Sequence, residues 1–124
     1  PMHADYAAIL REQRLDLLCR GPRILGMIAT VARGDQLWID NMAVDPDEQG
    51  RGLGRRLLVH AEALARAAGL RELHLVTNEA LTSNVALYED LGYRIDRREP
   101  FQGGTLVIMS KPTPPDGEDS DRLP

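Results

Sequence analysis

The strongest hydrophobic pattern of the chain lies between residues 36 and 69. Residues 36–44 form a short apolar run rich in β-forming side chains, and Pro46, which cannot donate to a strand ladder, closes it. From residue 53, apolar side chains recur at the spacing of one helix face: Leu53, Leu57, Leu58, Ala61, Leu64, Ala65 and Ala68. The pattern predicts a strand, a turn and a helix, which Gly69 ends as a left-handed cap.

Shorter patterns of the same two kinds occupy the rest of the chain. One helix is predicted at residues 5–13, and another from a Thr82 or Ser83 cap to Gly92. Because the long helix separates residues 36–44 from the next strand, these two strands should pair in parallel. The additional strands are predicted at residues 16–20, 23–32, 71–77, 93–98 and 105–110.

These elements predict one domain of the α/β (α+β) class, in which helices flank a single mixed central sheet. The chain has 124 residues, enough for one small core. We expect the domain to span residues 1–111. Residues 112–124 hold four of the eight prolines and few apolar side chains, which predicts a disordered tail.

Charge and composition exclude several classes of partner. The net charge of −4 comes mostly from residues 112–124, so the body is close to neutral and no basic face predicts nucleic-acid binding. No apolar run approaches the ~20 residues that cross a membrane. Cys19 is the single cysteine, which excludes an internal disulfide, and no metal site is predicted. Together these features favour a cytoplasmic protein.

Three glycines on alternate positions, Gly50, Gly52 and Gly54, connect the predicted strand to the long helix. Without side chains there, backbone N–H groups can approach a ligand closely. The amides of the first helical turn also lack intrahelical partners, and the helix dipole favours an anion at this end. Arginines add positive charge beside them: Arg51, Arg55 and Arg56. The connection predicts a site for a phosphate or diphosphate.

Two common phosphate loops do not match this site. A P-loop needs lysine after its last glycine, and the single lysine of the chain is Lys111. A dinucleotide fingerprint needs G-x-G-x-x-G, but Arg55 stands three residues after Gly52. The pattern that remains is Gln49-x-x-Gly52-x-Gly54. Its alternative interpretation is a glycine-rich connection that binds no ligand.

This pattern, preceded by Ala43-Val44-Asp45-Pro46, resembles the coenzyme A pyrophosphate loop of the Gcn5-related N-acetyltransferase (GNAT) family. The stretch NVALYEDLGY, residues 84–93, resembles the family's second signature. The resemblance covers roughly residues 15–111 and lacks the family's usual first strand and helix. It implies an acyl-CoA N-acyltransferase-like fold with acetyl-CoA as cofactor. The cofactor contacts it implies are Met42, Ala43, Val44, Gln49, Gly50, Arg51, Gly52, Leu53, Gly54, Arg55, Asn84 and Tyr88.

The resemblance also implies catalytic roles. Asn84 and Tyr88 are four residues apart, hence on one helix face. In the family the tyrosine hydroxyl meets the coenzyme sulfur, where it protonates the leaving thiolate, and the asparagine contacts the pantetheine arm. The alternative is that Tyr88 is a core residue and Asn84 supports the cap. Oxyanion and pantetheine donors would be main-chain groups near Met42 and Val44, where the family's strand splays from its parallel neighbour.

The candidate general base is Asp40, with Glu79 and Asn78 as reserve candidates. Asp40 is the only carboxylate inside residues 36–44, and strict alternation places it on the face of Trp38, Met42 and Val44. A role in orienting substrate or in a salt bridge fits Asp40 equally well, and water alone could carry the proton away. The residues predicted to contact the acceptor are Trp38, Asp40, Asn78, Glu79 and Phe101. The acids that flank the glycines are expected to be solvated turn residues: Asp45, Asp47 and Glu48.

The sequence therefore predicts an N-acetyltransferase that transfers the acetyl group of acetyl-CoA to a primary amine of a small molecule or peptide. A non-catalytic acyl-CoA-binding module, or a subunit of a larger assembly, is the alternative. A plain interaction domain fits the glycine pattern less well. Exposed sheet edges favour a homodimer.

Overall fold

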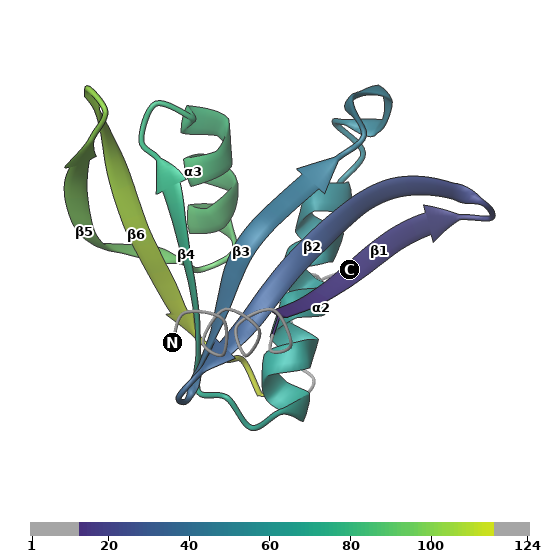
Figure 1. Cartoon of the computed structure of the whole chain (residues 1–124), viewed down its shortest axis with the longest axis horizontal. Helices are drawn as coiled ribbons and strands as arrows, with labels where there is room; N and C mark the ends of the chain where they lie inside the picture. The colour runs from purple at the N-terminus through teal and green to yellow at the C-terminus, as the bar shows by residue number, and fades with distance from the viewer. Residues whose placement is uncertain (1–12, 116–124) are drawn as a thin grey trace, which may run out of the picture.

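The computed structural model describes residues 13–115. One six-stranded mixed sheet has the strand order β1-β2-β3-β4-β6-β5, as predicted for a single central sheet (Figure 1). Its elements are β1 (Gln13–Arg20), β2 (Arg23–Arg33), β3 (Gln36–Val44), a 3₁₀ turn (Pro46–Glu48), α2 (Leu53–Ala67), β4 (Glu72–Asn78), α3 (Thr82–Asp90), β5 (Arg94–Phe101) and β6 (Gly104–Pro112). Residues 5–12 of the predicted helix and residues 116–124 of the predicted tail lie outside this range. Gln13, the predicted last residue of that helix, begins β1 instead, where it pairs with Val31 of β2.

The connections follow from the glycines between the elements. Gly34, with φ of 62°, turns β2 directly into β3, and the two strands pair antiparallel. The crossover through α2 makes β3 and β4 parallel, which confirms the predicted pairing. Gly69 and Gly92, with φ of 71° and 98°, follow the ends of α2 and α3 as predicted. No helix of residues 13–115 is long and apolar enough to cross a membrane.

The core lies between α2 and the sheet. Leu58, Ala61 and Ala65 of α2 are completely buried, against Leu73 of β4 and Met109 of β6. This is the apolar stripe that the sequence predicts for the long helix. The hydrophobic burial it provides fixes α2, and with it the glycine connection at its start, against the sheet.

Several predicted boundaries are wrong, beginning with β1, which starts at Gln13 rather than at residue 16. Leu81, not Thr82 or Ser83, is the N-cap of α3, and it makes no side-chain cap hydrogen bond. Strand β5 extends through Phe101, because the chain turns only at Gln102 and Gly103. Strand β6 passes the predicted end at Ser110 to include Lys111, which is buried and contacts Glu62 at 2.6 Å. Just beyond it, the Thr113 amide donates to the Arg71 carbonyl, at 2.9 Å.

Halfway along strand β3, its pairing with β4 ends and the alternation of its side chains between the two faces of the sheet reverses. Its pairing with β4 ends at Ile39 and Leu75, and beyond that pair the two strands diverge (Figure 1). The register with β2 shifts at the same level, so that Asp40 is an extra residue without a partner. Such a bulge reverses the alternation of side chains. Met42 and Val44 therefore pack against the core, and the prediction that Asp40 shares their face is wrong.

Gly26 of β2 is a site where this packing can be tested. A Cβ atom there would lie 2.9 Å from the Ala43 carbonyl oxygen and 3.2 Å from a Leu57 methyl group. The backbone oxygen cannot move aside without shifting β3. Gly26→Ala should therefore lower the free energy of unfolding by about 1–3 kcal/mol, measured by chemical denaturation. Gly104→Ala is the matched control, because its nearest contact would be an ordinary 3.6 Å to Asn78. Equal stability of the two variants would contradict this packing.

Candidate active site

A cleft of about 570 Å³ opens where β3 and β4 diverge. Its walls are the end of β3, the glycine loop, the start of α2 and one face of α3. The residues that line it are Met42, Ala43, Val44, Glu48, Gln49, Gly50, Gly52, Leu53, Gly54, Arg55, Ser83, Asn84, Leu87 and Tyr88. Every predicted cofactor residue except Arg51 is among them, although they come from four separate elements.

Free backbone amides dominate the loop end of the cleft. Gly50 and Gly52 have φ of 84° and 77°, a conformation that side chains disfavour. Gly52 is the N-cap of α2, and the first helix amide with a backbone acceptor belongs to Arg56, 3.1 Å from the Gly52 oxygen. The amides of Leu53, Gly54 and Arg55 have no acceptor among the described residues. Together with the positive end of the helix dipole, they form an anion site on the cleft.

Helix α3 supplies the opposite wall. Arg55 of α2 forms an ion pair with Asp90 of α3, which ties the two helices together across the cleft. Asn84 and Tyr88 lie one turn apart and both line the cleft. Ser83 and Leu87, which the sequence analysis missed, are their immediate neighbours, and the helical spacing of Asn84 and Tyr88 could have identified them.

The Tyr88 side chain is largely buried, with 9% of its surface exposed. Burial raises the pKa of its hydroxyl above the ordinary 10.0, because the phenolate would be poorly solvated there. The hydroxyl has no hydrogen-bond partner among the described residues. A neutral hydroxyl that faces a cleft can donate a proton or a hydrogen bond to a ligand.

The residues predicted to contact an acceptor do not line this cleft. Trp38 stacks on His74, with ring centroids 4.8 Å apart, and its indole N–H donates to Gln36. Asp40 is exposed, and its Oδ2 accepts a 3.3 Å hydrogen bond from Gln13. The bulge explains why the structure separates Asp40 from the cleft-lining side chains of β3.

The other predicted acceptor contacts lie at the end of β4, just beyond it, and on the β5–β6 hairpin. Asn78 Oδ1 accepts from the Ala80 amide at 2.9 Å, which shapes the turn into α3. Glu79 accepts from Arg98 at 2.6 Å, and Phe101 is half exposed. Their role in acceptor binding stays a prediction. No group of side chains within residues 13–115 has the composition of a metal site.

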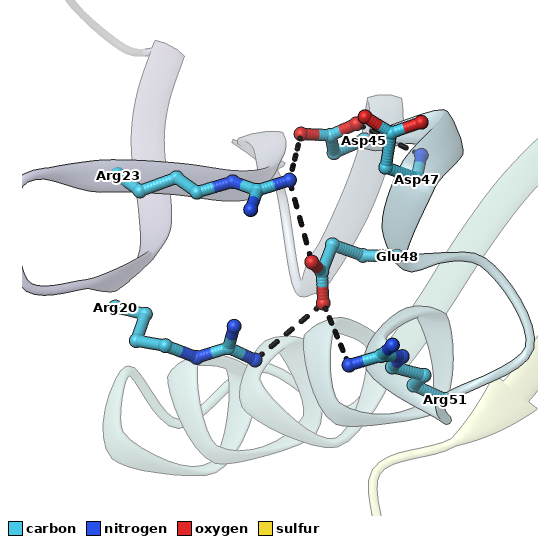
Figure 2. Close-up of polar contacts among 6 residues, drawn as sticks. All are labelled: Arg20, Arg23, Asp45, Asp47, Glu48 and Arg51. Atoms are coloured by element: carbon cyan, nitrogen blue, oxygen red, sulfur yellow. Dashed lines mark hydrogen bonds and ion pairs between the residues drawn. The ribbon is translucent and has the colours of Figure 1, made fainter.

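Glu48 departs most from its predicted role. It is only 4% exposed, so the prediction of a solvated turn residue is wrong for this carboxylate. Guanidinium groups of Arg20, Arg23 and Arg51 surround it (Figure 2). No local sequence signal identifies this cluster, because two of its arginines come from a hairpin more than twenty residues upstream.

Asp45, beside Glu48, is anchored as well. Its carboxylate accepts from the Asp47 amide at 2.9 Å and from Arg23 at 3.1 Å (Figure 2). The Asp47 amide and then the Arg23 guanidinium lower the pKa of Asp45 below its ordinary value. These contacts fix the turn that carries the chain from β3 into the glycine loop.

Comparison with known proteins relates the chain to one protein family. A model of the acetyltransferase (GNAT) family matches residues 2–93. N-alpha-acetyltransferase 80 of Mus musculus is 43% identical over 87 residues, covering 64% of this chain and 26% of that protein. The [ribosomal protein bS18]-alanine N-acetyltransferase of Salmonella typhimurium is 42% identical over 83 residues, covering 66% of this chain and 56% of that protein. The chain thus spans about a quarter and about half of these two relatives.

The fold gives the same result. The crystal structure of the ribosomal-protein-S18-alanine N-acetyltransferase from Escherichia coli matches with a TM-score of 0.77 and 28% sequence identity. The match covers 93% of this chain and 79% of that one. The chain therefore belongs to the acetyltransferase (GNAT) family, a family of acetyl-CoA-dependent acetyltransferases.

Proposed function

We propose that this chain is the catalytic domain of an N-acetyltransferase that transfers the acetyl group of acetyl-CoA to a primary amine of a peptide or small molecule. One observation carries the proposal: the free amides of Leu53, Gly54 and Arg55 open on the same cleft as the Tyr88 hydroxyl. The names of two relatives, an N-alpha-acetyltransferase and an alanine N-acetyltransferase, favour a peptide α-amine among the acceptors.

The cleft offers a different contact to each part of acetyl-CoA. The diphosphate would lie on the amides at the start of α2. The pantetheine arm would run beside Met42–Val44, where β3 has left β4 and its backbone groups on that side no longer meet a neighbouring strand. Amides there would also stabilise the oxyanion that forms on the thioester carbonyl. This direction brings the thioester sulfur towards Tyr88.

The reaction needs three proton transfers. An alkyl ammonium with a pKa of ~10 is a free amine about once in a thousand molecules at pH 7, so its proton must leave before attack. The amine then forms a bond to the thioester carbon, and the C–S bond breaks as Tyr88 protonates the departing thiolate. The nitrogen loses its second proton as the amide forms, and that proton restores the Tyr88 hydroxyl. Among the described residues that line the cleft, Glu48 is the one carboxylate, and arginines surround it. We therefore propose that the amine's proton leaves through water, with Asp40 or Glu79 as its acceptor.

Binding of the cofactor can be tested without knowledge of the acceptor. At a hundred times its Kd, acetyl-CoA should stabilise the protein by ~2.7 kcal/mol, which raises the Tm by several degrees. Differential scanning fluorimetry measures this shift. Acetyl-CoA should then release free thiol with peptides that have a free N-terminal amine, and not with N-acetylated copies of them. A thermal shift without thiol release would favour a non-catalytic acyl-CoA-binding module, and no shift at millimolar acetyl-CoA would contradict the proposal.

A further inference from the structure

At the loop end of the cleft, the Glu48 carboxylate forms ion pairs with three arginines from two separate segments of the chain. Arg20 and Arg23 flank the turn between β1 and β2, and Arg51 belongs to the glycine loop. The Glu48 carboxylate lies 3.4 Å from Arg20, 3.3 Å from Arg23 and 3.6 Å from Arg51. In Figure 2, Arg20 and Arg51 reach it from opposite sides. We name Arg20, Arg51 and Glu48 the rim cluster.

The guanidinium groups of the rim cluster have donors to spare. Each guanidinium carries five N–H groups, whereas a carboxylate offers about four lone-pair positions. Arg23 divides its donors between Glu48 and Asp45. Arg20 and Arg51 have Glu48 as their one ion-pair partner among the described residues, and about 60% of each side chain is exposed. Their remaining N–H groups are therefore available to an anion from solvent.

The rim cluster borders the diphosphate site. Glu48 itself lines the cleft, and so do Gly50 and Gly52 on either side of Arg51. The Arg51 side chain does not line the cleft, because it turns back to Glu48. Two cations thus lie against Glu48, a residue of the cleft that the free α2 amides also border, and neither cation lines that cleft.

We propose that Arg20 and Arg51 bind the ribose 3′-phosphate of coenzyme A, and that Glu48 is a positioning residue for both. The inference rests on the proposed function. Coenzyme A carries this third phosphate on the same ribose as its diphosphate, so a ligand seated on the loop presents a second anion one sugar ring away. Arginine binds phosphate oxygens through paired N–H groups. Glu48 holds the two guanidiniums in place beforehand, which reduces the ordering cost of binding.

The test compares coenzyme A with 3′-dephospho-coenzyme A, which lacks only this phosphate, by isothermal titration calorimetry. The wild-type protein should bind coenzyme A roughly 10- to 100-fold more tightly than 3′-dephospho-coenzyme A. In the double variant Arg20→Gln/Arg51→Gln this preference should shrink to about threefold or less, while the affinity for 3′-dephospho-coenzyme A stays close to that of the wild type. Both arginines are exposed, so the variants should fold, and a melting curve checks this.

Arg97→Gln is the matched control, because Arg97 is another exposed arginine in an ion pair, with Glu99 of β5. It should keep the full preference for coenzyme A. Equal affinity of the wild-type protein for both ligands would overturn the rim-cluster proposal and leave the acetyltransferase proposal intact. An equal loss of affinity for both ligands in the double variant would also overturn the rim-cluster proposal, since the arginines would then act on the diphosphate that the two ligands share. Failure of the wild-type protein to bind either ligand would contradict the proposed function itself.

Discussion

Replacing Tyr88 with phenylalanine should lower kcat by about 10²- to 10⁴-fold and leave the KM for acetyl-CoA nearly unchanged. The phenyl ring keeps the packing of Tyr88 in the core cluster, so only the hydroxyl is lost. In the proposed reaction this hydroxyl protonates the thiolate as the C–S bond breaks, a contact that is worth most in the transition state. Steady-state kinetics with thiol detection measures both constants.

The raised pKa of Tyr88 adds a pH dependence to this expectation. Because burial moves the pKa upward from 10.0, the phenol of the folded protein is less ionised at any given alkaline pH than an ordinary tyrosine. The kcat of the wild-type enzyme should therefore not fall on the alkaline side up to about pH 9 through loss of this proton. The phenylalanine variant should be slower by the same factor across that range.

Tyr93→Phe is the matched control for Tyr88. The two rings lie 6.0 Å apart in an edge arrangement, and Tyr93 is also buried. The Tyr93 hydroxyl does not line the cleft and has no hydrogen-bond partner among the described residues. Its removal should leave kcat unchanged. Wild-type kcat in the Tyr88 variant, or an equal loss in both variants, would contradict a proton-donor role for Tyr88.

Local sequence signals predicted the parts of the fold that rest on local physics. The bounds of β3 match the predicted strand at residues 36–44, because Gly34 forms the turn before the strand and Pro46 ends it. The α2 stripe and its Gly69 end were predicted for a similar reason: helical spacing and a positive φ are properties of a few neighbouring residues. The glycine loop and the Asn84–Tyr88 pair belong to this class, and the structure brings them to one cleft.

The errors arose where a distant partner decides the outcome. The bulge at Asp40 depends on the register between β2 and β3, which alternation within one strand cannot show. Glu48 is buried because a hairpin upstream places Arg20 and Arg23 over it, although its own neighbours predict solvent exposure. The error at the start of α3 is a local one. The Asn78 side chain accepts from the Ala80 amide and the Asn78 carbonyl from the Leu81 amide, so the turn forms without a Thr82 or Ser83 cap.

Replacing Gly54 with glutamate should weaken acetyl-CoA binding severely while the free protein stays folded and at least as stable. Gly54 lies in the first turn of α2, where glutamate has a better helix propensity than glycine and a carboxylate favours the helix dipole. Its Cβ atom would meet a Leu87 methyl group at 3.4 Å, a contact that a flexible side chain can relieve. The same carboxylate would occupy the anion site. At ~4 Å and an effective dielectric constant of ~20, its repulsion of a phosphate is ~4 kcal/mol, or about 10³-fold in Kd.

Two further variants separate charge from size. Gly54→Ala adds one carbon and should bind acetyl-CoA close to the wild-type affinity, because the added Cβ meets only the ends of the Leu87 and Met42 side chains. Gly54→Gln has the bulk of glutamate without its charge, so its Kd measures crowding alone. The glutamate variant should bind at least tenfold more weakly than the glutamine variant, and the gap should narrow as salt screens the repulsion. If glutamate and glutamine weaken binding equally, or if the glutamate variant binds normally, then no phosphate lies on the α2 amides, and the placement of the thioester beside Tyr88 loses its anchor.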